Sequence, residues 1–186
     1  MRTRTDHITL IAAVIGCCLS AFSTPGLASR EVWIAGGRLA FHGGVVNAAC
    51  TVDAASAHQT VQMGQVRKEA FHSIGDWQVP TDFQILLEDC STNVSQNVSV
   101  MFTGLTDGKD PQVFQVSATS NAAQGVGIGI FDATGNLVVP NSTPLRSTAL
   151  LNGETVLHFS AKYRSTDRNV KPGIAQSEVW FNLLYQ

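Results

Sequence analysis

The sequence predicts an all-β fold, an immunoglobulin-like sandwich in one domain. Apolar and polar residues alternate in short runs, which is the pattern of half-buried strands. These runs recur at intervals of about ten residues and are separated by Gly, Asn, Asp, Ser and Pro, as expected for a sandwich of short strands. Only 14% of the residues are charged, whereas about a quarter is usual. The predicted surface is therefore rich in Thr, Ser, Asn and Gln.

The first element, residues 1–28, predicts a secretory signal peptide that is removed from the mature protein. Arg2 and Arg4 precede an apolar run over residues 8–19, and small residues with a proline follow. The run is too short to span a bilayer comfortably as a permanent helix. The predicted cleavage site lies after Ala28.

The cysteines bear on both export and fold. The letters "VIGC" match the loose pattern for lipoprotein processing, so lipidation of Cys17 and membrane anchoring are an alternative to cleavage. After cleavage only Cys50 and Cys90 remain, in an oxidising compartment where a disulfide is expected. Closing a loop of about 40 residues predicts a stabilisation of roughly 4 kcal/mol.

Strand patterns continue from residue 31 to the end of the sequence. The run "GVGIGIFDATGNLVV" predicts a hairpin with its turn at "DATGN", and segment 66–76 predicts at most one turn of helix. The predicted strands span residues 31–43, 45–54, 58–66, 82–90, 97–104, 112–118, 125–139, 155–165 and 178–186. The side chains that share the apolar faces of the longer strands are Phe83, Ile85, Leu87, Val98, Val100, Phe102, Leu157, Phe159, Ala161, Tyr163, Val179, Phe181, Leu183 and Tyr185.

The sequence has no pattern typical of an enzyme, a metal site or a nucleic-acid site. The histidines after the signal lack metal-ligand spacings. Gly125, Gly127 and Gly129 lack the spacing of a phosphate-binding loop, so they predict close packing within a strand. The loop "DGKDP" at 107–111 could hold a cation, but a surface turn is the preferred interpretation. The net charge of −2 offers no basic field for nucleic acid. We therefore expect no enzymatic activity, no cofactor and no metal.

The segment 29–41, ahead of the predicted domain at 42–186, has the character of a free extended strand. Alternate apolar residues with a glycine in the middle suit a peptide that adds to another sheet, because glycine marks close backbone approach. The residues on one face are Trp33, Ala35, Gly37 and Leu39. The opposite frame remains open, with Val32, Ile34 and Gly36.

Several separate motifs, in order, give the chain a family resemblance. The run "FHGGVVNAACTVDAASAHQTVQMGQV", the second cysteine in "ILLEDCSTNVS", Gly173 and the penultimate Tyr185 are all present. Over residues 30–186 the sequence resembles the fimbrins, the subunits of type 1 chaperone–usher pili. Within that family, "FHSIGD", "DATGNLV" and "GIAQSEVWF" resemble most closely the minor fimbrin-like subunits encoded beside the major fimbrin.

The resemblance implies an immunoglobulin-like domain that lacks its last strand, so that the C-terminal strand flanks an open groove. A periplasmic chaperone would fill the groove, and an outer-membrane usher would exchange it for the N-terminal extension of the next subunit, such as the major fimbrin. The protein would then reach the cell-surface pilus through the periplasm. The donor residues implied are Trp33, Ala35, Gly37 and Leu39. The groove-edge residues implied are Gly173, Val179, Phe181, Leu183 and Tyr185.

Bulky residues near the two joining surfaces predict a special position in the pilus. Trp33 stands where the resemblance implies a small residue in rod subunits, and Arg38 and Trp180 add further bulk. An awkward donor strand makes a poor chain extender, so we expect a minor subunit that terminates or anchors the rod. An ordinary shaft subunit is the alternative. A tip adhesin would need a second, receptor-binding domain, and a stand-alone periplasmic or lipid-anchored binding sandwich would be soluble and monomeric without a chaperone.

Overall fold

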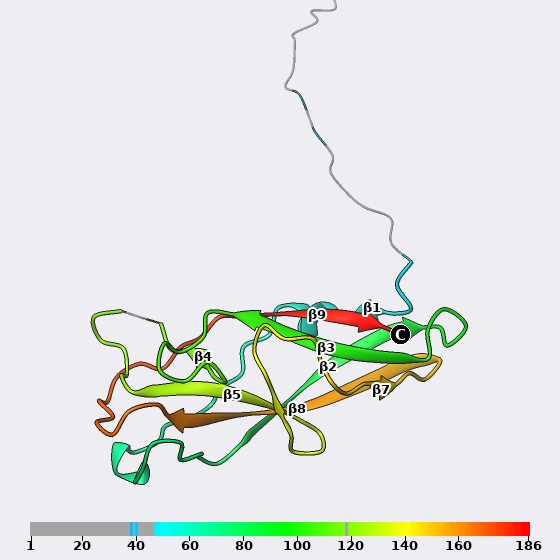
Figure 1. Cartoon of the computed structure of the whole chain (residues 1–186). Helices are drawn as coiled ribbons and strands as arrows, with labels where there is room; N and C mark the ends of the chain where they lie inside the picture. Colours follow the sequence, from blue (N-terminus) through cyan, green and yellow to red (C-terminus); the bar gives the residue numbers. More distant parts are fainter. Residues whose placement is uncertain (1–37, 39, 41–46, 118) are drawn as a thin grey trace, which may run out of the picture. The chain divides into compact units, whose positions relative to one another are not determined.

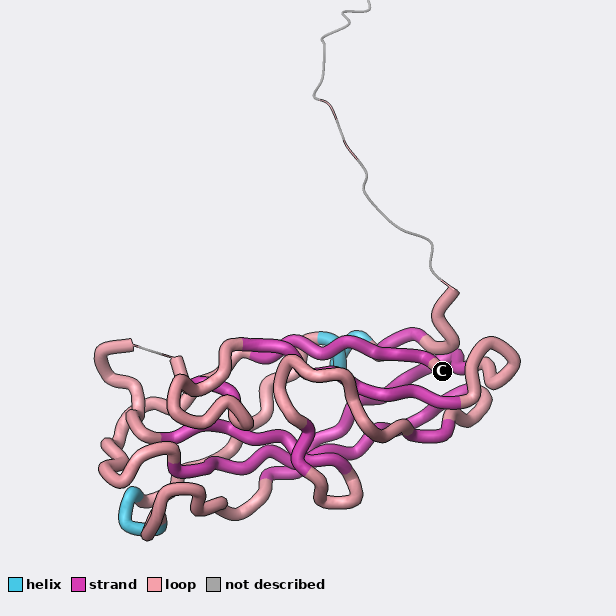
Figure 2. Tube along the Cα trace, in the orientation of Figure 1, coloured by secondary structure: helices cyan, strands magenta, loops and turns pink. Residues whose placement is uncertain are grey.

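The computed structural model describes residues 38, 40, 47–117 and 119–186. From residue 47 onward these residues form two antiparallel β-sheets (Figure 1). Strands and loops make up nearly all of this part of the chain (Figure 2). Apolar side chains from both sheets share one core, so the predicted all-β sandwich is confirmed.

The larger sheet has six strands in the order β1-β2-β8-β5-β4, with β6 paired to β5, and the smaller sheet has the order β7-β3-β9. The helical elements are α2 (Ala54–Ala57) and the 3-10 helix η1 (Lys68–Ala70). In chain order the strands are β1 (Thr51–Val52), β2 (Thr81–Cys90), β3 (Asn97–Gly104), β4 (Phe114–Gln115), β5 (Val126–Asp132), β6 (Leu137–Val138), β7 (Thr148–Ala149), β8 (Gly153–Ser165) and β9 (Val179–Tyr185).

The core forms where the alternation of side chains predicted it. The inward residues of β2, β3 and β8 interdigitate between the two sheets, since successive side chains of a strand point to opposite faces. At the centre, Phe102 packs edge-on against Phe159 with ring centroids 5.1 Å apart, and Phe83 stacks on Phe159 at 5.6 Å. The buried members of this cluster include Ile85, Leu87, Val98, Val100, Phe102 and Leu157.

Three predicted strands are shorter than expected or missing. Within the described residues 47–54, the strand predicted over 45–54 is limited to β1, and it ends where the Asp53 side chain accepts a hydrogen bond from the Ser56 backbone N–H at 2.9 Å and starts the turn of α2. Segment 58–66 is not a strand, and within the described residues 112–117 the strand predicted over 112–118 shortens to β4. The strand predicted over 31–43 lies outside the described residues, apart from positions 38 and 40.

The glycines of β5 allow close packing, as predicted. A Cβ atom at Gly127 would overlap the Val113 side chain, and one at Gly129 would overlap the Trp77 ring. Trp77 therefore lies against the strand and meets Phe131 edge-on, with ring centroids 4.8 Å apart.

Replacing Gly129 with alanine is expected to lower the free energy of unfolding by about 1–3 kcal/mol, because the added methyl group displaces the Trp77 ring. Urea unfolding followed by tryptophan fluorescence measures the change. The matched control is Gly108→Ala, since no atom lies within 4 Å of a Cβ there. An equal effect of the two substitutions would contradict the packing role of Gly129.

The turn between β5 and β6 depends on one carboxylate. Asp132 Oδ1 accepts hydrogen bonds from the backbone N–H groups of Thr134 and Asn136, each at 2.9 Å. Burial raises the pKa of Asp132, but the hydrogen bonds from Asn136 and Thr134 outweigh it and hold this pKa below its ordinary value of 3.8. The carboxylate is therefore more acidic in the folded chain than in the unfolded chain.

This shift predicts an acid-sensitive part of the stability. A carboxyl whose pKa is lowered by folding stabilises the fold fully above its ordinary pKa, and the contribution is lost as the pH falls through the folded value. We expect Asp132→Asn to unfold at lower urea concentration at pH 7 and to lose less stability than wild type between pH 5 and pH 2. Asp82→Asn, at an exposed position, is the control. Parallel pH profiles for wild type and Asp132→Asn would contradict this account.

Candidate functional site

The candidate site is the free edge of β9, the last strand of the smaller sheet. β9 pairs with β3 along its whole length, from Val179 opposite Gly104 to Tyr185 opposite Val98. In the part of the chain that the structure describes, no strand pairs with the other side of β9. Such an edge presents backbone N–H and C=O groups that can pair with another chain.

Hydrogen-bond alternation determines which residues offer these groups. Asn97 and Gln186 exchange both backbone hydrogen bonds, at 3.2 and 3.0 Å. In an antiparallel pair, successive residues direct their backbone groups alternately toward and away from the partner strand. The even-numbered residues of β9 therefore face β3. The groups at the free edge belong to Val179, Phe181, Leu183 and Tyr185.

The side chains of these same four residues form an incompletely covered apolar face. They pack against the core cluster but are only partly buried. On the neighbouring strand the inward residues Val98, Val100 and Phe102 are 1, 7 and 3% exposed. The two strands present the same kind of face to the same core, so the difference arises because β9 lies at the border. A further strand beside β9 would cover both its backbone groups and its side chains.

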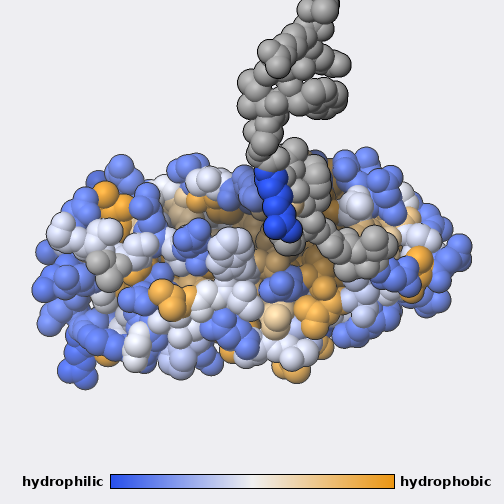
Figure 3. All heavy atoms as spheres, turned by 90° about the horizontal axis from the view of Figure 1, so that it is seen from above, coloured by the Kyte–Doolittle hydropathy of each residue, from blue (hydrophilic) through white to orange (hydrophobic). Residues whose placement is uncertain are grey.

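The space that such a strand would fill is called the opening. The segment leading into β1 borders the opening at one end. The Tyr185 hydroxyl donates a hydrogen bond to the Cys50 carbonyl oxygen at 3.2 Å. Burial raises the pKa of Tyr185, and its hydrogen bond to Cys50 lowers that pKa in part. Figure 3 views the molecule from the side on which β9 and β1 lie in Figure 1, and hydrophobic side chains gather there around a hollow.

The predicted disulfide joins Cys50 to Cys90, across 40 residues of sequence. Cys50 directly precedes β1, and Cys90 ends β2. Both residues belong to the core cluster and are buried. The bond therefore ties the segment that borders the opening to a central strand of the larger sheet.

Gly173 lies before β9 and not within it. A Cβ atom there would overlap the backbone of Ala122 and Ala123, and the Ala123 N–H donates to the carbonyl oxygen of Ile174 at 2.9 Å. Gly173 therefore permits two segments to approach closely. It lines a hollow of about 430 Å³, together with Phe71 and Tyr163. Its implied role at the groove edge stays a prediction.

The residues implied as the donor strand, Trp33, Ala35, Gly37 and Leu39, lie outside the described residues. Their role and frame therefore remain predictions. Over the described ranges, no helix is both long and apolar enough to cross a membrane.

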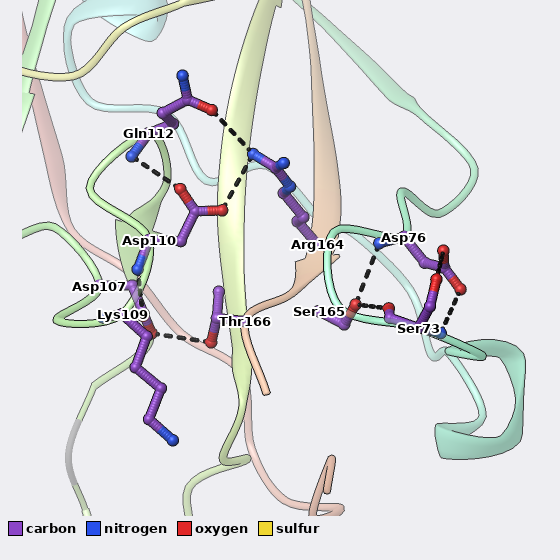
Figure 4. Close-up of polar contacts among 9 residues, drawn as sticks. All are labelled: Ser73, Asp76, Asp107, Lys109, Asp110, Gln112, Arg164, Ser165 and Thr166. Atoms are coloured by element: carbon purple, nitrogen blue, oxygen red, sulfur yellow. Dashed lines mark hydrogen bonds and ion pairs between the residues drawn. The ribbon is translucent and has the colours of Figure 1, made fainter. Parts of the chain in front are cut away.

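The acidic loop 107–111 is a structural turn (Figure 4). Asp107 Oδ1 accepts hydrogen bonds from the backbone N–H groups of Lys109 at 2.8 Å and Asp110 at 3.1 Å. Asp110 also pairs with Arg164 at 3.0 Å. Among the described residues, no group of three or more His, Cys, Asp or Glu side chains is placed to hold a metal ion. The carboxylates of this loop thus fold the turn and anchor it to β8.

Sequence reasoning missed the side chains that substitute for strand partners. Along the outer edge of β2, the Ser56 hydroxyl accepts from the Leu86 N–H at 3.0 Å, and the Gln59 side chain donates to the Gln84 carbonyl at 3.1 Å. The signal available was only the Asp53 cap that starts α2. These contacts cover an edge beside β1 that would otherwise be open.

Comparisons with known proteins agree on one family. The model described as "Fimbrial protein" matches residues 39–186. The chain is 37% identical over 175 residues to the putative fimbrin-like protein FimI of Salmonella typhi, which covers 94% of this chain and 97% of that protein. It is 38% identical over 183 residues to the type-1 fimbrial protein, A chain, of Escherichia coli, which covers 96% and 99%.

Solved structures of similar fold are also pilus subunits. The P pilus rod subunit PapA has a TM-score of 0.65 and 25% identity, over 75% of this chain and all of that chain (100%). A subunit from a chaperone–usher pilus structure that concerns rod uncoiling has a TM-score of 0.64 and 25% identity, over 84% of this chain and 99% of that chain.

Proposed function

The chain belongs to the fimbrial protein family, and we propose that it enters its pilus by donor-strand exchange at the β9 edge. It is a pilus subunit of the chaperone–usher type, made to polymerise with other subunits and exported to the cell-surface pilus. Its family is one of structural subunits and not of enzymes. The observation that carries the proposal is that Phe181 and its three inward neighbours on β9 combine backbone groups that no described strand pairs with and apolar side chains that are only half covered.

The uncovered β9 edge needs a partner strand both before and after the subunit joins the pilus. Exposed apolar area costs about 25 cal/mol per Å² relative to buried area, and an open strand edge invites aggregation. A periplasmic chaperone strand covers the β9 edge after export. At the outer-membrane usher, the segment 29–41 of the next subunit then replaces that strand. The signal 1–28 and the folded domain 42–186 complete the proposed organisation.

The test is expression of the mature chain in the periplasm with and without its pilus chaperone, followed by size-exclusion chromatography. We expect the chain only as a one-to-one complex with the chaperone, and aggregated or degraded chain without it. A stable monomer in the absence of the chaperone would mean that the sandwich is complete, and the binding-sandwich alternative would replace the proposal.

We further infer that this subunit terminates or anchors the rod, as its sequence predicts. The identities of 37% to the fimbrin-like relative and 38% to the type-1 A chain do not separate minor from major subunits. Support comes from bulk at the joining surfaces. The Trp180 side chain on β9 is 68% exposed on the face away from the core, next to the edge that a donor would occupy.

Mixed assembly with the major subunit tests whether this subunit ends the rod. A terminator added at increasing ratio shortens the pili, because each incorporated copy ends one fibre. Electron microscopy measures the length distribution. Unchanged lengths with the added subunit incorporated along the rod would support the shaft alternative.

A further inference from the structure

Strand β3 has a second edge, on the side away from β9, and among the described residues its partner strand there is short. β7 pairs only with Asn97 and Val98. Because the backbone groups of Asn97 face β9, those of the even-numbered residues face this second edge. An uncovered β3 edge would accept a strand as readily as β9, so what covers it matters for assembly.

The first cause of the short β7 is a charged side chain that a longer strand would turn toward the core. β7 places Thr148 opposite Val98, and the same register would place Arg146 opposite Val100. Directly opposite residues of an antiparallel pair share a face, and Val100 faces the core. Continued pairing would therefore turn the Arg146 guanidinium inward, which is costly without a partner. Instead Arg146 stays 64% exposed and pairs with Asp132 at 3.8 Å.

The second cause is a proline. An asparagine makes hydrogen bonds to β3 where a longer β7 would have made them. The β7 register would put Pro144 opposite Phe102, but proline has no N–H to donate. The Asn141 N–H donates to the Phe102 carbonyl oxygen at 2.9 Å. The Asn141 side-chain amide exchanges two hydrogen bonds with the backbone of Gly104, each at 3.0 Å. Asn141 adopts a φ of 58°, a conformation that asparagine tolerates better than most residues.

Between Asn141 and Thr148 the chain arches away from β3. A hollow of about 710 Å³ remains beneath the arch, lined in part by Val98, Val100 and Phe159. Covered positions thus lie on both sides of Val100, and the stretch left open is too short to pair with an incoming strand.

We propose that Asn141, Pro144 and Arg146 close the second edge of β3 to strand addition and thereby restrict it to β9. Inward-pointing charges and proline are general means of protecting a sheet edge. The inference rests on the proposed function, because it states how a subunit with two sheet borders accepts only one donor. The hollow beneath the arch follows from the same arrangement, since the chain cannot lie flat on β3.

The test opens the second edge while β9 is filled. A synthetic peptide of residues 29–41 occupies β9, and the double variant Asn141→Gly, Arg146→Val removes the amide pair and the charge that continued pairing would turn inward. Glycine accepts the φ of position 141 without strain. The matched control is Asn93→Gly, Arg168→Val, at exposed loop positions. Native mass spectrometry counts peptides per chain, and hydrogen exchange follows the amides of residues 100–104.

We expect wild type and control to take one peptide and stay monomeric. The double variant should take a second peptide or self-associate at a concentration at least about tenfold lower than wild type, with slowed exchange at residues 100–104. A double variant that stays monomeric with one peptide overturns the inference, as does a wild-type chain that takes a second peptide at β3. If wild type binds no peptide, the chain's own segment 29–41 is a poor donor for β9 and the chaperone experiment decides the proposed function, while self-association of the variant through residues 100–104 still decides the inference. Arg146→Val alone keeps the Asn141 anchor and repeats the test if the double variant does not fold.

Discussion

Replacing Cys50 and Cys90 together with alanine is expected to leave little folded protein in the periplasm. The disulfide closes a loop of 40 residues, and restricting the unfolded chain in this way stabilises the fold by about 4 kcal/mol. Whole domains are stable by only about 5–15 kcal/mol. The amount of folded protein should fall further here because β9 lacks a second neighbour among the described residues. The fold therefore has less apolar burial to compensate for the lost disulfide.

Loss of the disulfide should also have a local effect, which hydrogen exchange can measure. Cys50 precedes β1 and its carbonyl accepts the hydrogen bond from Tyr185. Without the disulfide, the segment that borders the opening should detach first. We expect fast hydrogen exchange at Thr51 and Val52 in the reduced wild-type chain, and a lower urea midpoint than in the oxidised chain. Equal midpoints for the oxidised, reduced and alanine forms would show that the bond contributes nothing to the fold.

The long strands could be predicted from the sequence because their side chains alternate between core and solvent. In β2, β3 and β8 the inward residues are the apolar ones, and the two sheets bury them together. The hairpin of β5 and β6 could be predicted for a similar local reason, since Asp132 folds the turn with its own neighbours. Here the determinants of structure lie within a few residues of each other.

Strand edges could not be predicted in the same way, because they depend on contacts between distant residues. The sequence around Gln59 alternates like a strand, but its side chain bonds to Gln84 in place of a ladder. Asn141 likewise bonds to Gly104, 37 residues away in sequence. An alternating pattern specifies the faces of a strand but not which of its edges has a partner. The β9 pattern would therefore be the same in a complete sandwich, and only the resemblance to fimbrins predicted an open groove.

Changing Phe181 to aspartate is expected to abolish capture of the complementing strand. Phe181 lies directly opposite Phe102 on β3, whose side chain is 3% exposed. When a strand covers the β9 edge, residue 181 becomes fully enclosed, and an unpaired carboxylate there must shed its water. We expect a cost of at least about 3 kcal/mol, which is more than a hundredfold in affinity. Co-expression with the chaperone should then yield no one-to-one complex.

The neighbouring Asn182→Asp is the matched control, because it adds the same charge one residue along the same strand. Asn182 is exposed, and its backbone groups already face β3, so we expect a change below about 0.5 kcal/mol and an unchanged yield of complex. The pair separates two explanations of a loss. A general effect of negative charge on β9 would impair both variants, whereas an apolar groove on one face impairs only Phe181→Asp. Normal capture by Phe181→Asp would mean that the partner does not cover this face, and the site would have to be sought elsewhere on the sandwich.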